Sequence, residues 1–205
     1  MSVYFERPRN FYYAAGQWLD LRYPDDAPGT ATTMSFASSP TEPDIMISFR
    51  DGVSPFKRRL QASEPGDNLI LTQYGGGFRL NPRRPALLLA GGIGLAVFRS
   101  MIKEAMDTRV STSLALVCIN GTSPGIYDEE LLQWCEAFSA LTLRSYATKT
   151  EGRLTAKALQ MLAPDLLDRD VYIAGPPAMV QHCVRLAIDL GVDLRAITTD
   201  VFDGY

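Results

Sequence analysis

Two glycine-containing loops follow apolar segments, and their residue types suit the binding of a phosphate. Residues 86–101 read ALLLAGGIGLAVFRSM, and Gly175-Pro176-Pro177 follows a second apolar segment. Glycine lets a ligand approach the backbone closely, and the free amides at a helix start favour an anion. The first loop therefore indicates a nucleotide site, with close packing of a helix on a strand as the alternative reason for its glycines.

The first loop does not carry the usual dinucleotide fingerprint. That fingerprint is GxGxxG, followed about 20 residues later by an acidic residue that holds a ribose. Here Gly92-Ile93-Gly94 continues as Leu95-Ala96-Val97, so the third glycine is missing, and the next apolar run ends at Asn120. The loop by itself leaves the nucleotide interpretation and the packing interpretation open.

Cysteine and histidine usage excludes several other chemistries. Cys118, Cys135 and Cys183 are far apart, which argues against an iron–sulfur cluster or zinc ribbon on this chain. His182 is the single histidine, so a Ser-His-Asp triad elsewhere and a histidine-rich metal site are not expected. We interpret it as structural and predict no metal site.

Composition and charge limit the classes of partner that the chain can bind. The net charge of −3 over 205 residues gives no electrostatic basis for binding nucleic acid or an anionic membrane. No apolar run approaches the roughly 20 residues that a membrane span needs. The first residues, MSVYFERPRNFYY, contain no apolar signal core. The expected compartment is the cytoplasm.

The first part of the chain predicts an antiparallel β-barrel. Short alternating segments are separated by turn-forming stretches, which is typical of a barrel or a sandwich. The expected strands are Gln17–Tyr23, Met34–Ser38, Asp44–Arg50 and Asn68–Gln73. One short helix is expected to interrupt them, with Ser54 as its N-cap and Pro55 at its first position.

The second part predicts a doubly wound parallel α/β unit, because strands alternate with helices. Its expected strands are Ala86–Ala90, Leu114–Ile119, Leu141–Tyr146, Val171–Ala174 and Ala196–Phe202. Its expected helices are Gly94–Met106, Tyr127–Phe138, Thr155–Leu162 and Ala178–Leu190. The proline-rich stretch at residues 81–85 suggests a division into domains 1–82 and 84–205. Both glycine loops would then meet at the carboxyl edge of the sheet, where such folds bind ligands.

The order of motifs along the chain resembles the ferredoxin–NADP reductase superfamily, whose members pair a flavin-binding barrel with a nicotinamide-nucleotide domain. The matching segments span nearly the whole chain: Ala15–Trp18, Met34–Pro40, Gly52–Ser54, Arg59-Leu60, Gly66-Asp67, Gly75–Phe78, Ala90–Gly94, Ala174–Met179 and Phe202–Tyr205. The resemblance implies FAD, with FMN as the alternative, and NADH or NADPH as substrate.

The resemblance also implies roles for individual residues. The residues implied to bind the cofactors are Met34, Phe36, Gly52, Val53, Ser54, Gly91, Gly92, Ile93, Gly94, Gly175, Pro176, Pro177 and Met179. Ser35 would hydrogen-bond the flavin N5 edge, and Tyr205 would stack on the flavin where nicotinamide must enter. Asp200 would tune the flavin or relay a proton, with a solvated strand-end carboxylate as the alternative.

The chain departs from the family pattern at several positions. The usual arginine and aromatic before the flavin serine are Thr32 and Met34, which removes a charged contact to the flavin phosphate. The usual Thr-Pro after the glycine loop is Ala96-Val97, and a frequent cysteine is Ala174. The N-terminus also looks short, so we expect the first barrel strand to be incomplete.

These residues predict a reductase that passes a hydride from NAD(P)H to flavin and electrons to a separate acceptor. The acceptor is a ferredoxin-like iron–sulfur protein, another protein of a complex or a small molecule. Asn120-Gly121-Thr122 lacks an arginine for a 2′-phosphate, which favours NADH, although Lys149 is a candidate basic contact. The alternatives are a flavin-free subunit of this fold with a binding role, and a subunit whose missing strand comes from a partner.

Overall fold

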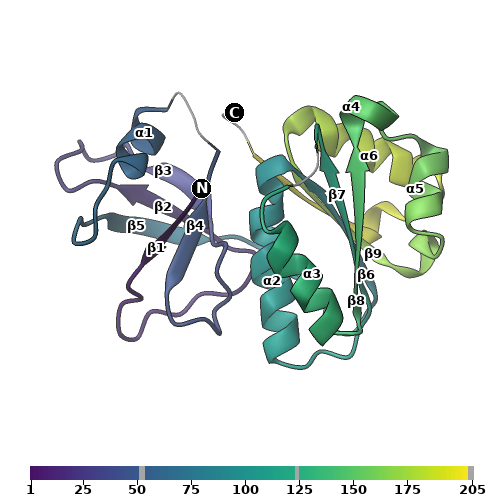
Figure 1. The fold of residues 1–205 in the computed structure, drawn as a ribbon, viewed down its shortest axis with the longest axis horizontal. Coiled ribbons are helices and arrows are strands. Elements are labelled where there is room, and N and C mark those ends of the chain that lie inside the picture. The colour runs from purple at the N-terminus through teal and green to yellow at the C-terminus, as the bar shows by residue number, and fades with distance from the viewer. Residues whose placement is uncertain (51–53, 123–124, 203–205) are drawn as a thin grey trace.

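The computed structural model describes residues 1–50, 54–122 and 125–202, and its strands form two groups (Figure 1). Strands β1 to β5 form two small antiparallel sheets, and β6 to β10 form one parallel sheet. The fold class predicted from the sequence, an antiparallel barrel followed by a parallel α/β unit, is confirmed. The domain boundary near residue 83 remains a prediction.

The antiparallel part surrounds its own apolar core. Its strands are β1 (Ser2–Phe5), β2 (Trp18–Arg22), β3 (Thr32–Ser35), β4 (Ile45–Ser48) and β5 (Ile70–Gly75). β1 pairs with β4, while β2 lies between β3 and β5. Leu19 of β2, Ile47 of β4 and Phe36, which directly follows β3, lie in one buried cluster. Helix α1 (Pro55–Gln61) begins after Ser54 as expected, but the Ser54 side chain makes no capping hydrogen bond.

The parallel sheet has the strand order β10-β9-β6-β7-β8 and is covered on both faces. Its strands are β6 (Ala86–Gly91), β7 (Leu114–Asn120), β8 (Leu141–Ala147), β9 (Asp170–Gly175) and β10 (Ile197–Val201). Successive side chains of a strand point to opposite faces. Leu88 accordingly lies in the core beneath α2 and α3, and Leu87 and Leu89 lie in the core beneath α5 and α6. This explains why β6 is apolar throughout.

The helices of the parallel part alternate with its strands. They are α2 (Leu95–Asp107), α3 (Asp128–Ala137), α4 (Thr148–Glu151), α5 (Ala156–Leu162) and α6 (Pro177–Asp189). Figure 1 shows α2 and α3 on the side of the sheet that faces the barrel and α5 and α6 on the other side. None of the helices within the described ranges is long and apolar enough to cross a membrane.

Helix α2 also packs against the barrel. Ala15 and Phe78 from the antiparallel part belong to the same buried cluster as Phe98 and Met101 of α2. The rings of Phe78 and Phe98 lie 5.7 Å apart, centroid to centroid. The hydroxyl of Ser100 donates a hydrogen bond to the Ser38 carbonyl at 2.6 Å. The two parts of the chain therefore meet through a shared apolar cluster and through hydrogen bonds.

Some element boundaries differ from those expected. The strand predicted at Met34–Ser38 spans Thr32–Ser35, because the amides of Ala37 and Ser38 both donate to the Met46 carbonyl and break the regular ladder. Strand β1 and helix α4 were not expected, and each has four residues. Segments this short carry too few positions for a periodic pattern to be visible.

Candidate functional site

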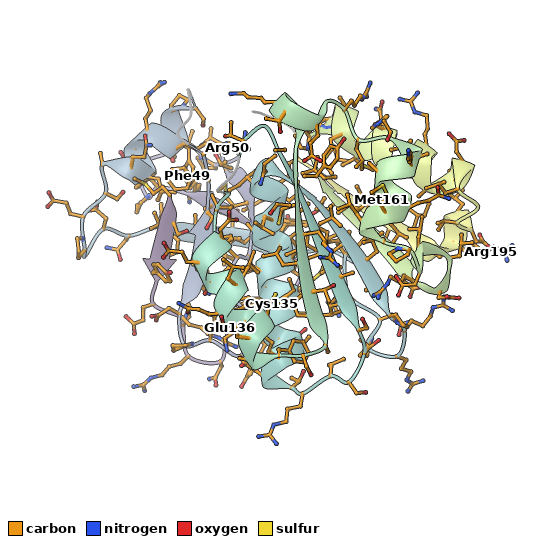
Figure 2. All side chains as sticks on the ribbon, turned by 45° about the vertical axis from the view of Figure 1, so that its right-hand side comes forward. Phe49, Arg50, Cys135, Glu136, Met161 and Arg195 are labelled. Carbon is orange, nitrogen blue, oxygen red and sulfur yellow. The ribbon has the colours of Figure 1, made fainter. Side chains whose placement is uncertain are left out.

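A small cavity of about 60 Å³ lies where the barrel meets the first glycine loop. Its lining residues are Thr33, Met34, Ser35, Ser48, Phe49, Arg50, Lys57, Ile93, Ala96 and Phe202. Figure 2 labels Phe49 and Arg50 on the barrel side of this junction. The fold thus brings Met34 and Ser35 next to Ile93, as the sequence analysis expects of a shared cofactor site. We call this space the junction cavity.

The three predicted flavin residues of β3 and its extension differ in what they expose. Ser35 is half-buried and lines the junction cavity. Met34 is 8% exposed, belongs to the barrel core and also lines the cavity. Phe36 is fully buried, and its ring stacks on Tyr13 at 4.0 Å. The Phe36 side chain is therefore committed to the barrel core, and only its backbone can face a ligand.

The two glycine loops touch each other at the carboxyl edge of the parallel sheet. A Cβ atom built on Gly175 would lie 3.0 Å from the Cα of Gly91. A Cβ on Gly91 would lie 2.0 Å from the sulfur of Met179 and 3.0 Å from Pro176. Gly94 has the same constraint, since its Cβ would lie 2.4 Å from the Ala174 carbonyl oxygen. Close packing is thus sufficient to require glycine at all three positions.

Gly92 has a different environment, which involves Asn120, from the loop considered for a 2′-phosphate, and Arg50, which the sequence analysis did not place in the site. Its backbone has a φ of +54°, a left-handed conformation that favours glycine. Its amide donates to the side-chain oxygen of Asn120 at 3.2 Å. A Cβ on Gly92 would lie 2.3 Å from the guanidinium of Arg50. Asn120 orients the loop and Arg50 covers it, so both belong to the site.

The charges around the junction cavity are positive. Arg50 and Lys57 line it, and none of the described lining residues is acidic. The serines at its wall add hydroxyl groups, and Ser48 accepts a hydrogen bond from the hydroxyl of Tyr127. Basic side chains with hydroxyls at the rim of an apolar space favour an anionic ligand that carries an apolar ring. The sequence does contain a feature that points to Arg50, since this basic residue directly follows an apolar strand segment.

Tyr127 connects this wall to α3. It occupies the N-cap position of α3 with a φ of 63°, a left-handed conformation that is rare for an aromatic residue. Burial raises the pKa of its hydroxyl, and the hydrogen bond to Ser48 counteracts that rise. The ring also lies 5.6 Å from the Arg99 guanidinium. The strained backbone of Tyr127 is held by contacts on both sides of the junction.

Asp200 lies on β10, opposite Ala174 in the register with β9. This position places it one strand away from the loop that begins at Gly175. Burial raises the pKa of the Asp200 carboxyl above its ordinary value, while the backbone amide of Val201 counteracts that rise. The Asp200 side chain is half-buried, and its role toward the flavin or a proton stays a prediction. Phe202, two residues later, reaches the junction cavity.

Three predicted site residues lie outside the described residues, namely Gly52, Val53 and Tyr205. Pro176 is the N-cap of α6 and Pro177 its first residue, so they set the direction in which α6 leaves the sheet. His182 contacts the Leu154 carbonyl at 2.6 Å on the other side of α6. Within the described ranges, no group of three or more histidine, cysteine or acidic side chains could hold a metal ion.

Comparisons with known proteins agree with this geometry. Residues 88–185 match the family model of the oxidoreductase NAD-binding domain. The chain is 26% identical over 209 residues to the ferredoxin reductase component of the 3-ketosteroid-9-alpha-monooxygenase of Mycobacterium tuberculosis, covering 95% of this chain and 56% of the relative. It is 26% identical to reductase component 2 of the terephthalate 1,2-dioxygenase of a Comamonas species, covering 93% of this chain and 59% of the relative.

Solved structures share the fold. A cytochrome P450 reductase from Amycolatopsis superposes with a TM-score of 0.81 at 21% identity, covering 98% of this chain and 64% of that one. The ferredoxin–NADP⁺ reductase of Plasmodium falciparum superposes with a TM-score of 0.77 at 13% identity, covering 98% and 94%. The chain spans between half and two thirds of the length of the curated relatives described above.

Proposed function

Because the chain resembles the ferredoxin–NADP reductase superfamily in sequence and shares its fold, we propose that it is a flavin-dependent reductase. When bound, NADH or NADPH supplies a hydride, and the flavin accepts it and releases electrons to a separate acceptor. The observation that carries this proposal is the junction cavity, in which Ser35 of the barrel and Ile93 of the nucleotide loop line the same space.

The basic and hydroxyl side chains of the junction cavity suit a flavin. The cavity is too small to hold a flavin unless a side chain moves. Pockets for ligands of this size measure roughly 300–1,000 Å³, whereas the junction cavity measures about 60 Å³. The guanidinium of Arg50 covers Gly92, so a flavin in this space would require the Arg50 side chain to turn away. Arg50 and Lys57 would then meet the negative charge that Thr32 cannot pair. They take over the role of the arginine that the family usually has at residue 32.

The remaining residues of the site position the reactants. Ser35 offers a hydroxyl at the cavity wall, where it would hydrogen-bond the reactive edge of the flavin. Ile93 and Ala96 present apolar surface that excludes water from that edge. The loops at residues 91–94 and 175–179 would receive the nicotinamide nucleotide at the carboxyl edge of the sheet. Tyr205 would stack on the flavin, and Asp200 would lie close enough to that edge to exchange a proton.

We place NADH ahead of NADPH as the donor. The loop after β7 contains no arginine, and the Lys149 side chain lies beside it, with its Cε 3.8 Å from a Cβ built on Gly121. The amide of Lys149 donates to the Gly121 carbonyl at 3.2 Å, so the backbone of this exposed lysine is fixed beside the loop. If Lys149 held a 2′-phosphate, Lys149→Ala would weaken NADPH binding selectively. We expect instead that Lys149→Ala leaves NADPH binding unchanged, and that NADH binds more tightly than NADPH to the native chain and to the variant.

The electron acceptor is a separate protein with an iron–sulfur cluster. Two of the relatives above are named as reductase components of a monooxygenase and a dioxygenase, and one of them as a ferredoxin reductase component. The reaction takes place in the cytoplasm, where the three free thiols of the chain stay reduced. Cys118 and Cys183 are buried, and burial raises the pKa of each thiol to about 12, which leaves them unreactive at neutral pH.

Flavin and nicotinamide titrations test this proposal. Purified protein titrated with FAD or FMN should perturb the flavin absorption bands, and anaerobic NADH should then bleach them faster than NADPH. Ser35→Ala should slow the bleaching about tenfold, which corresponds to ~1.4 kcal/mol for one lost hydrogen bond. Ser111→Ala, at an exposed serine, is the matched control and should leave the rate unchanged. Protein that takes up neither flavin would contradict the proposal.

A second candidate function follows from Thr32 and from the small volume of the junction cavity. Both favour a flavin-free subunit of this fold that binds within a redox complex. Such a subunit would take up neither FAD nor FMN in the same titration. It would still bind NADH if the glycine loops alone hold the nucleotide, so quenching of tryptophan fluorescence by NADH without flavin uptake would favour this candidate.

A further inference from the structure

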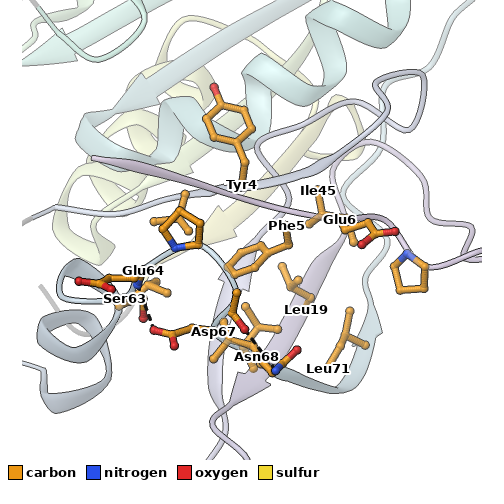
Figure 3. Close-up of a pocket in the computed structure, with 17 residues that line it drawn as sticks. Tyr4, Phe5, Glu6, Leu19, Ile45, Ser63, Glu64, Asp67, Asn68 and Leu71 are labelled. Carbon is orange, nitrogen blue, oxygen red and sulfur yellow. Dashed lines mark hydrogen bonds between the residues drawn. The ribbon is translucent and has the colours of Figure 1, made fainter.

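A second hollow, larger than the junction cavity, lies in the barrel away from it. It is a groove of about 760 Å³ between β1 and the segment that leads into β5 (Figure 3). Its lining residues are Val3, Tyr4, Phe5, Glu6, Pro8, Leu19, Leu21, Ile45, Leu60, Ser63, Glu64, Pro65, Gly66, Asp67, Asn68, Leu69 and Leu71. We call it the barrel groove.

The barrel groove is bordered by two strands that each have one open edge. Among the described strands, β1 pairs only with β4, and β5 pairs only with β2. The two antiparallel sheets therefore do not close on each other along this side. An unpaired strand edge presents a row of backbone donors and acceptors that can pair with another extended segment.

The backbone groups at the open edge of β1 can be assigned. Met1 and Phe49 exchange both of their backbone hydrogen bonds, with N···O distances of 3.1 Å. In an antiparallel pair such doubly bonded positions alternate with unbonded ones. The N–H and C=O of Val3 therefore face β4, whereas those of Ser2 and Tyr4 face the barrel groove.

The floor and rim of the barrel groove differ in character. Leu19 and Ile45 at the floor are buried, and Phe5 and Leu71 remain half-exposed beside them. Figure 3 shows Phe5 and Leu19 pointing toward the middle of the hollow. The charged residues among the lining are all acidic: Glu6, Glu64 and Asp67. An occupant must therefore bring apolar side chains for the floor and positive charge for the rim.

We propose that the barrel groove binds an extended segment of another polypeptide by β-strand addition between β1 and β5. The segment has apolar residues at every second position, which point to the floor, and lysine or arginine between them, which meet the acidic rim. Main-chain hydrogen bonds supply affinity and the alternate side chains supply specificity. The bordering strands have four and six residues, so the added strand is of similar length. This inference is independent of the flavin proposal.

A short synthetic peptide tests the inference directly. Fluorescein-labelled acetyl-KVTVKVTK-amide has the required alternation, and acetyl-KKTVVVTK-amide has the same composition without it. The first should bind in fluorescence anisotropy, more weakly as salt is raised, and should shift the backbone amide resonances of β1 and β5. The second should bind at least tenfold more weakly. Equal binding of both peptides, or shifts confined to other strands, would overturn the inference.

Variants at the open edge of β1 and at the acidic rim test the same inference on the protein itself. Tyr4→Pro removes the N–H that faces the groove, and proline is tolerated on edge strands. It should lower peptide affinity at least tenfold, and Tyr4→Thr, which keeps the N–H, should bind the peptide more tightly than Tyr4→Pro does. Glu64→Lys, with an intact backbone, should weaken binding and reduce its salt dependence even if Tyr4→Pro does not fold. Unchanged binding by Tyr4→Pro or Glu64→Lys contradicts strand addition. A dimer of this chain that the peptide dissociates would assign the groove to a second copy instead.

Discussion

At the scale of single residues, the glycines of the nucleotide loop serve packing as well as binding. Gly91, Gly94 and Gly175 lie within contact distance of backbone or side chains from the opposite loop. Gly92 combines a left-handed backbone with a side-chain neighbour, Arg50, from outside both loops. A glycine loop in a sequence therefore has two physical explanations, and here three of the four glycines satisfy the packing explanation.

Substitution of Gly94 tests the packing role. In Gly94→Ala the new Cβ would lie 2.4 Å from the Ala174 carbonyl oxygen, which belongs to a central strand and cannot move freely. We expect a loss of about 1–3 kcal/mol in the free energy of unfolding, measured by urea denaturation. Gly77→Ala is the control, because nothing lies within 4 Å of its Cβ position, and it should change stability by less than about 0.5 kcal/mol. Equal losses in both variants would contradict this explanation.

Asp200 makes stability depend on pH. Burial raises the pKa of its carboxyl in the folded chain, so the unfolded chain releases this proton at a lower pH than the folded chain does. The contribution of Asp200 to the free energy of unfolding therefore falls as pH rises from about 4 through the raised pKa. Asp200→Asn should gain stability relative to the native chain between pH 4 and pH 7, measured by urea denaturation at both values. A difference that does not change with pH would count against this.

At the scale of elements, α2 is the element on which both parts of the molecule depend. Its apolar face packs on the parallel sheet and on Phe78, and its buried Arg99 reaches the barrel and α3. Arg99 donates to both carboxylate oxygens of Glu42 at 2.9 and 3.0 Å and to those of Glu130 at 2.6 and 2.7 Å. Burial lowers the pKa of Arg99, but the bonds to Glu42 and Glu130 outweigh it and raise that pKa.

Removal of Arg99 should loosen the contact between the two parts. Arg99→Met leaves Glu42 and Glu130 without their cation, and breaking a buried pair costs ~3–5 kcal/mol. Because both glutamates keep part of their surface in water, we expect about 2–3 kcal/mol in the free energy of unfolding. Lys103→Met is the matched control on α2, since its pair with Asp107 lies within one helix and contributes ~0.3–0.5 kcal/mol. Equal losses would contradict the role of Arg99.

At the scale of the whole molecule, the shared core predicts that the barrel and the α/β part unfold together. Ala15 and Phe78 belong to the same buried cluster as α2, so neither part can open without exposing apolar surface of the other. The cavity proposed for the flavin lies at this junction, and its geometry depends on both parts being in place.

The two tryptophans report on this cooperativity, because Trp18 lies in β2 and Trp134 in α3. Trp18→Phe leaves a probe in the α/β part, and Trp134→Phe leaves one in the barrel. Circular dichroism of each variant measures how far the substitution itself shifts the midpoint of urea unfolding. After this shift is subtracted, the fluorescence transitions of the two variants should have the same midpoint. Two separated midpoints would mean that the parts unfold independently.

The sequence by itself determined the order of the strands and of the longer helices of the α/β part, because apolar runs such as residues 86–90 and long amphipathic segments have a visible period. It also determined the fold class and the family resemblance, which depend on residues close together in the chain. It did not determine β1, which has four residues, or the early end of β3, which results from a hydrogen-bonding arrangement at the Met46 carbonyl.

Only the tertiary structure decided what the candidate site contains. Arg50 covers Gly92, and the Gly92 amide bonds to Asn120, although these residues are far apart in the chain. The burial of Phe36 depends on the direction of its side chain, which the local pattern does not specify. The open barrel groove likewise depends on which strand edges remain unpaired. Local patterns specify elements, whereas the space between elements is set by packing over long sequence separations, and the site and the barrel groove are both such spaces.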